Sequence, residues 1–174
     1  LTQPAGQHMP MLLDADALNL VAQHAHLADL VKARHAETVM TPHAGEAARL
    51  LATTAESIQN NRIDAALQLA ATFKVSCVLK GAGTVCAYHD GSYVVNATGN
   101  PALATGGTGD VLTGLIASLI AQGVKPLDAA KLGVYTHGLA ADHLVKKGVG
   151  PIGVTASEVL LEARSILNQL HALS

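Results

Sequence analysis

The sequence predicts an α/β fold in which a mainly parallel sheet is flanked by helices, with a β-meander in the middle of the chain. In the first part of the chain, short apolar runs alternate with amphipathic segments, as in layered α/β proteins. Between residues 75 and 95, three β-rich runs follow one another with only turns between them, which is typical of a meander. The 174 residues suffice for one core, and we expect residues 1–174 to form a single domain.

The elements before the meander follow from apolar runs and their spacing. We expect a buried strand at 11–13 with a helix from about residue 16, then a strand at 38–40 with a helix at 46–52. Apolar residues recur at roughly helical spacing from 57 to 73, which predicts a helical segment. Buried strands need neighbours on both sides, and this part of the chain offers few. We therefore expect the domain to be N-terminally incomplete.

The meander and the helices after it complete the predicted fold. Asp90 and Gly91 lie between two β-rich runs and predict the tight turn of a hairpin. Pro126 suits the first turn of a helix, and Gly148 suits a position just past the end of one. The expected strands are 75–79, 84–88 and 92–95, and the expected helices are 109–122, 126–147 and 155–169.

The composition excludes several classes of partner. The formal net charge is -2, Lys and Arg form no run, and aromatic residues make up 2% of the chain, which argues against a nucleic-acid partner. No stretch of about 18 consecutive apolar residues occurs, so we expect no membrane span and a cytoplasmic protein. Cys77 and Cys86 lie in apolar runs and are expected to be reduced core thiols. With no H-E-x-x-H and no Cys-x-x-Cys motif, we expect no metal bound by the protein itself.

A glycine-rich turn directly precedes the helix expected at 109–122. Main-chain N–H groups of Gly106, Gly107, Thr108 and Gly109, together with the positive end of the helix, predict an anion hole that suits phosphate. Asp110 at its mouth is a candidate base that takes a proton from a hydroxyl beside a transferring phosphoryl group. Equally, Asp110 is explained as a first-turn acid that the helix dipole favours. The turn follows neither standard nucleotide-binding fingerprint.

Four motifs in order give the chain its resemblance to a known family: "LLDADALN", "TPHAGEAARL", "VLKGAGTV" and "NPALATGGTGDVLTGLIASLIAQG". From about residue 12 to about residue 170 it resembles the ADP/ATP-dependent NAD(P)H-hydrate dehydratases. The resemblance implies a ribokinase-like fold. It also implies that hydrated NADH or NADPH is the substrate, with ADP or ATP as co-substrate and Mg²⁺ entering with the nucleotide. In that reaction the ring hydroxyl is phosphorylated and phosphate then leaves, which restores the reduced nicotinamide.

The resemblance also implies roles for individual residues. Asp110 matches the acid of the family at the hydrated ring, which supports its role as the base. A lysine at a strand end, followed by glycines that let the chain pass close, suits a phosphate or ribose contact; the alternative is a plain β-turn with an exposed lysine. The implied nucleotide-binding residues are Lys80, Gly81, Ala82, Gly83, Thr84 and Gly109, and the implied substrate-binding residues are His43, Glu46, Asn19 and Asp110.

Some of these positions have simpler explanations, and two other functions stay open. Glu46 is also explained as a first-turn acid of its helix, and Asp16, which with Asp14 is a further candidate for the cleft, as a helix cap. A ribokinase-like kinase of a small molecule, such as a hydroxymethyl pyrimidine, would use the same anion hole and base. An inactive nucleotide-binding module would bind nucleotide without turnover. An Ala-rich surface and an incomplete sheet would suit a homo-oligomer.

Overall fold

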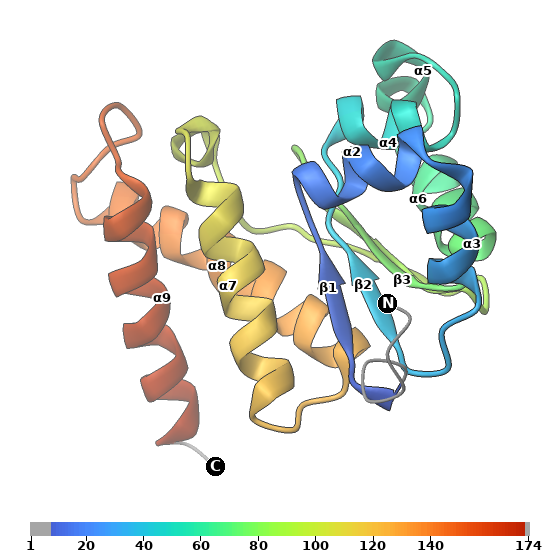
Figure 1. The fold of residues 1–174 in the computed structure, drawn as a ribbon. Coiled ribbons are helices and arrows are strands. Elements are labelled where there is room, and N and C mark those ends of the chain that lie inside the picture. Colours follow the sequence, from blue (N-terminus) through green and yellow to red (C-terminus); the bar gives the residue numbers. More distant parts are fainter. Residues whose placement is uncertain (1–7, 173–174) are drawn as a thin grey trace.

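The computed structural model describes residues 8–172 and confirms the α/β prediction. Five short strands form one sheet in chain order, with the first three parallel and the last three antiparallel (Figure 1). The parallel part and the meander therefore share strand β3. The strands are β1 (Met11–Leu13), β2 (Thr38–Met40), β3 (Ser76–Leu79), β4 (Val85–Ala87) and β5 (Tyr93–Val95).

Helices cover both faces of the sheet, as Figure 1 shows. Those that come before the meander in the chain lie on one face, and those after it lie on the other. The first group is α2 (Asp16–Gln23), α3 (Ala25–Lys32), α4 (Ala44–Leu50), α5 (Ala55–Asn60) and α6 (Arg62–Phe73). The second group is the short 3₁₀-helix η1 (Pro101–Ala104), α7 (Thr108–Ala121), α8 (Pro126–Lys146) and α9 (Ala156–His171).

The alternation of side chains along the strands separates two cores. On β3, Cys77 and Leu79 pack into the core under α2 to α6, while Val78 points to the opposite core beneath α7 and α8. Both faces of β3 are thus buried, which explains why apolar residues follow one another from Cys77 to Leu79 instead of alternating with polar ones. A third cluster packs α9 against α7 and α8, away from the sheet.

The two cysteines lie in these cores, as predicted. Cys77 and Cys86 are both buried with free thiols, and they point to opposite faces of the sheet. Burial raises the pKa of the Cys86 thiol to about 11 and that of Cys77 still further, which keeps both neutral. Within residues 8–172, no helix has the length and apolar character needed to cross a bilayer.

The segment 57–73, predicted to be helical, is helical but divided into two. The structure has two helices with a break at Asn61, which adopts an extended φ of -137°. Thr54 caps the first of them, and its Oγ1 accepts a hydrogen bond from the Ser57 N–H at 3.1 Å. The apolar spacing continues across the break because both helices pack on the same core.

Smaller differences occur at other helices. The helix predicted from residue 16 ends at Gln23, where His24 is extended, and α3 starts directly after it. Helix α4 begins at Ala44 rather than at 46 because His43 caps it. The 3₁₀-helix η1 was not predicted, since four residues are too few for a periodic signal.

A buried carboxylate ties the outermost helix α9 to α8. Glu162 accepts a hydrogen bond from Lys147 Nζ at 2.6 Å, and its other oxygen lies 3.2 Å from His143 Nδ1. The hydrogen bond from Lys147 holds the pKa of Glu162 below its ordinary 4.5. A carboxyl whose pKa is lowered on folding adds stability at high pH and loses it as the pH falls through the lowered pKa.

We predict that Glu162→Gln lowers the free energy of unfolding at pH 7 by on the order of 1 kcal/mol, since Lys147 is itself half exposed. Urea unfolding at several pH values measures the effect. The gap between native and variant protein should shrink as the pH falls below 4.5. Glu37→Gln, at an exposed loop position before β2, is the matched control and should leave stability unchanged. A gap for Glu162→Gln that stays constant with pH would contradict the assigned ion pair.

Candidate active site at the carboxyl ends of the parallel strands

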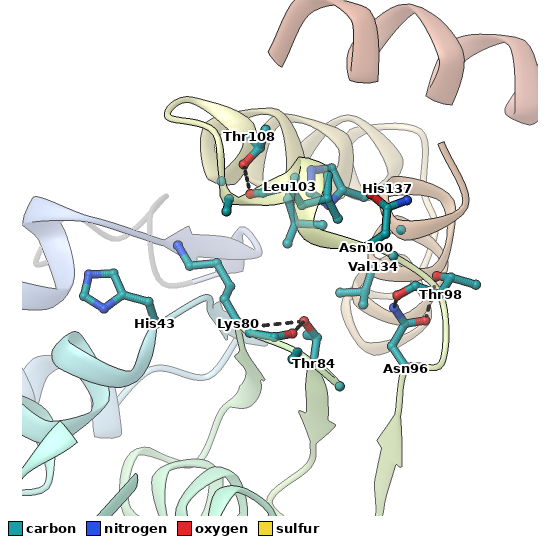
Figure 2. A pocket seen from close by; sticks show the side chains of 18 of the residues that line it. His43, Lys80, Thr84, Asn96, Thr98, Asn100, Leu103, Thr108, Val134 and His137 are labelled. Atoms are coloured by element: carbon teal, nitrogen blue, oxygen red, sulfur yellow. Dashed lines mark hydrogen bonds between the residues drawn. The ribbon is translucent and has the colours of Figure 1, made fainter. Parts of the chain in front are cut away.

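A pocket of about 740 Å³ lies where the carboxyl ends of the parallel strands meet the start of α7 (Figure 2). In open α/β sheets this edge is the usual place for a ligand. Its walls come from the loop after β3, the segment from the end of β5 to the start of α7, and one face of α8. The residues that line it include His43, Lys80, Gly81, Ala82, Gly83, Thr84, Asn96, Thr98, Gly99, Asn100, Leu103, Thr108, Gly109, Val134, His137 and Gly138.

Lys80 joins three elements at this edge. It follows β3, and its Nζ donates a hydrogen bond to Asp14 Oδ1, at the end of β1, over 2.7 Å. The other oxygen of Asp14 accepts a hydrogen bond from Thr113 Oγ1 of α7. Burial by itself raises the pKa of Asp14, but the hydrogen bonds from Lys80 and Thr113 and the charge of Lys80 outweigh it and lower that pKa. Asp14 is therefore a carboxylate and Lys80 its ammonium partner.

The loop 80–84 passes close to the pocket with a main chain that other groups hold in place. Gly81 has a φ of +147°, and a Cβ there would lie 2.8 Å from the Arg62 guanidinium, so only glycine fits. Arg62 Nη2 donates to the Leu79 carbonyl at 2.9 Å, and Thr84 Oγ1 donates to the Gly81 carbonyl at 3.0 Å. Five of the six predicted nucleotide-binding residues, 80–84, thus form one ordered loop that lines the pocket, and the sixth, Gly109, lies in α7.

The first turn of α7 forms the wall opposite this loop. Thr108 and Gly109 line the pocket, and a Cβ on Gly109 would lie 3.6 Å from Lys80 Nζ, so the ammonium lies beside the start of the helix. The first N–H groups of an α-helix have no acceptor within the helix and carry its positive dipole end. An ammonium and a helix N-terminus side by side can bind the phosphates of a ligand. Gly106 and Gly107 precede this turn, exposed and outside the pocket lining.

Asp110 does not line the large pocket. It is exposed and borders a second, shallower hollow of about 460 Å³ between α7 and α9, with Val111, Gly114, Leu115, Ser118 and Leu160. Sequence reasoning placed the base and the anion hole in one turn, and the structure keeps them adjacent in the chain. It directs them toward different hollows on either side of α7.

His43 and Glu46 form a capping box at the start of α4. His43 Nδ1 accepts hydrogen bonds from the N–H groups of Gly45 and Glu46, and Glu46 Oε2 accepts one from the His43 N–H at 2.8 Å. His43 also lines the pocket with a half-exposed side chain, whereas Glu46 is buried outside it. The spacing of an acceptor and a glutamate three residues later is the sequence signal for this box, with histidine in place of the usual Ser or Thr.

Asn19 and Asp16 lie on α2, away from the pocket lining. Asn19 Oδ1 accepts a hydrogen bond from Arg49 Nη1 at 3.0 Å, which joins α2 to α4. Asp16 is exposed at the start of α2 and makes no side-chain capping bond there. Of the three polar residues in this motif, Asp14 is the one the fold brings to the pocket edge, through its pair with Lys80.

Sequence reasoning missed the wall that α8 contributes. His137 is 7% exposed and lines the pocket, and its Nε2 has no hydrogen-bond partner among the described residues. Burial lowers the pKa of His137 to about 4, although a hydrogen bond to the Thr108 main chain partly offsets this. The ring is therefore neutral at pH 7. No local signal marks His137, because its role follows from packing against a turn far away in the sequence.

Comparison with known proteins agrees with this architecture. The chain is 43% identical over 162 residues to the ADP-dependent (S)-NAD(P)H-hydrate dehydratase of Neisseria meningitidis, a match covering 92% of this chain and 54% of that protein. It is 48% identical over 139 residues to a bifunctional NAD(P)H-hydrate repair enzyme of Moorella thermoacetica, covering 80% of this chain and 26% of that protein. The chain thus spans about half of the first relative and about a quarter of the second.

Solved structures give the fold. A Bacillus subtilis ADP/ATP-dependent NAD(P)H-hydrate dehydratase, co-crystallised with ATP and Mg²⁺, matches with a TM-score of 0.80 and 32% identity, over 92% of this chain and 55% of that one. A ribokinase-like superfamily protein of Enterococcus faecalis matches with a TM-score of 0.72 and 28% identity. That match covers 91% of this chain and 52% of the other. The ribokinase-like fold is confirmed. Because the profile of the NAD(P)H-hydrate dehydratase family matches residues 2–163, the chain belongs to that family.

Proposed function

We propose that this chain carries out the nucleotide-dependent dehydration of hydrated NADH and NADPH. The observation that carries the proposal is the meeting of Lys80 with the first turn of α7 beside the loop 80–84, inside one pocket. These groups suit the phosphates of ADP or ATP, and family membership supplies the nature of the second substrate. Hydroxide is a poor leaving group, and transfer of a phosphoryl group from the nucleotide would convert it into phosphate, which leaves more readily.

The proposed reaction has two steps. Asp110 takes the proton of the ring hydroxyl, whose oxygen then attacks the terminal phosphorus of the nucleotide, and the bond from that phosphorus to its bridging oxygen breaks. The C–O bond of the new phosphate ester then breaks, with its electron pair leaving on phosphate and the lone pair of the ring nitrogen stabilising the cation. Loss of a proton from the neighbouring ring carbon restores the reduced nicotinamide.

The residues in the pocket divide this work. The loop 80–84 and Gly109 hold the nucleotide, and the N–H groups around 106–109 stabilise the charge on the phosphoryl group as it transfers. His43 contacts the hydrated dinucleotide, while Glu46 orients His43 through the capping box. In residues 8–172 no three His, Cys, Asp or Glu side chains gather into a potential metal site. We propose that Mg²⁺ arrives with the nucleotide, bound by phosphate oxygens and water.

The proposal is tested directly by mixing the protein with hydrated NADH, Mg²⁺ and either ADP or ATP, while the absorbance of reduced nicotinamide is followed. Recovery that requires nucleotide supports the dehydratase. A stable phosphorylated product without free phosphate would favour a small-molecule kinase. No recovery, with nucleotide still raising the melting temperature, would leave a binding module, since a ligand that binds only the native state stabilises it.

We predict that Asp110→Asn lowers turnover by about 100-fold or more, because general-base catalysis typically supplies that much, and leaves nucleotide affinity within about twofold. Steady-state rates and calorimetric titration with ATP measure the two effects. Asp128→Asn, which changes an exposed first-turn acid of α8 in the same way, is the control and should retain full activity. An Asp110→Asn variant with native turnover would show that another group accepts the proton.

We predict that Lys80→Ala weakens nucleotide binding about tenfold or more, because it removes the ammonium beside the start of α7. It should also lower stability, since Asp14 loses its partner while it stays largely buried. Titration with ATP and urea unfolding separate these effects. Lys146→Ala, at an exposed lysine near the end of α8, is the matched control. Unchanged affinity in Lys80→Ala would limit Lys80 to a structural role with Asp14.

A further inference from the structure

The side chain of Asp142 in α8 contacts the pocket wall that runs from Asn96 to Ala104. Asp142 of α8 accepts two hydrogen bonds through its two carboxylate oxygens. One comes from the Gly99 N–H at 2.9 Å and the other from Asn100 Nδ2 at 2.9 Å. These contacts join residues more than 40 positions apart, so α8 fixes where the chain runs as it leaves β5.

Close packing along α8 supports the same wall. Thr98 Oγ1 donates to the Tyr135 carbonyl at 3.0 Å. A Cβ on Gly138 would lie 2.2 Å from Thr98 Oγ1 and 2.7 Å from the Thr98 carbonyl carbon, so the wall lies directly on the helix backbone there. Any side chain at Gly138 would push the wall into the pocket, and Gly138 itself lines that pocket.

A chain of hydrogen bonds continues from Asp142 to the start of α7. Asn100 Oδ1 accepts from the Ala102 N–H at 3.0 Å and caps η1. The last turn of η1 presents the Leu103 carbonyl to Thr108 Oγ1 at 2.7 Å, and Thr108 is the first residue of α7 (Figure 2). The bond to Gly99 is exposed to solvent and the other links are partly buried, and each polar contact orients the residue that makes the next one. The carboxylate on α8 is thus connected to the turn that lines the phosphate end of the pocket.

We infer that Asp142 is a positioning residue for the proposed anion hole, acting through Asn100 and Thr108. Its side chain is not among those that line the pocket. Its two hydrogen bonds set the path of residues 99–104, and that path sets where the N–H groups of 106–109 point. The role in binding phosphate rests on the proposed function. The series of hydrogen bonds from Asp142 to Thr108 is a property of the fold and does not depend on that function.

A reciprocal exchange of the two side chains tests the connection. In Asp142→Asn, the new amide oxygen still accepts the hydrogen bond from the Gly99 N–H. The new amide nitrogen then faces Asn100 Nδ2, so two donors face each other without an acceptor. In Asn100→Asp, two carboxylates face each other. The double variant Asn100→Asp, Asp142→Asn restores every bond with the donor and acceptor exchanged. The amide, now on α8, accepts from Gly99 and donates to the carboxylate on the wall, whose second oxygen still caps η1. The net charge equals that of the native chain.

Two measurements follow these variants. Amide hydrogen exchange at Gly99, and at Thr108 and Val111, whose N–H groups donate to the Thr105 and Gly107 carbonyls, reports the wall and the turn without any ligand. Calorimetric titration with ATP and the repair rate report function. We expect Asp142→Asn to speed exchange at both places and to weaken ATP binding about tenfold, as the loss of a charge-assisted hydrogen bond typically does. The double variant should return both values to within about twofold of native. Asp128→Asn on the same helix should change neither.

Two results would overturn the inference. Exchange that quickens at Gly99 while Thr108 and Val111 stay protected would show that the effect of Asp142 ends at the wall. A double variant no better than Asp142→Asn would show that the pairing of these two side chains does not matter. If the native chain neither binds ATP nor repairs hydrated NADH, the proposed function fails, and the exchange data still decide whether Asp142 orders the turn.

Discussion

The ion pair between Lys80 and Asp14 is the contact around which the rest of the site is arranged. It reaches across β2 from the end of β3 to the end of β1, and Thr113 extends it to α7. Both partners are largely buried, at 19% and 10% side-chain exposure, so their charges are stable there only because they neutralise each other. The pair therefore fixes the position of α7 on the sheet edge and, with it, the helix end that faces the pocket.

The rest of the pocket is built from main chain held by distant side chains. Arg62 holds the loop 80–84 through the Leu79 carbonyl, and Asp142 holds the wall through Gly99. This arrangement suits phosphate, because N–H groups that are already in place lose little entropy on binding and need no reorganisation when charge develops on an oxygen.

The sequence predicts best the features that depend on residues close together in the chain. The strands, the meander and α7 to α9 follow from short-range apolar patterns and were predicted within a few residues. The break at Asn61 was missed because hydrophobic spacing reports the face a helix buries, and α5 and α6 bury the same face. Lys80, Thr108 and Gly109 were predicted from their local chemistry and line the pocket, whereas Gly106 and Gly107 of the same turn do not. Asp142 and His137 could not be predicted, since their partners lie far away in the sequence.

The two hollows on either side of α7 bear on how phosphoryl transfer would proceed. Successive residues of an α-helix point about 100° apart, so a turn that directs Gly109 into one hollow directs Asp110 toward the next. In-line transfer places the attacking and leaving oxygens on opposite sides of phosphorus. Under the proposed function, the nucleotide approaches the first turn from the large pocket, which His43 also lines, and the substrate hydroxyl must reach Asp110 at the same helix end. Because Gly109 and Asp110 follow one another in the first turn of α7, a single helix end would serve both reactants under the proposed function.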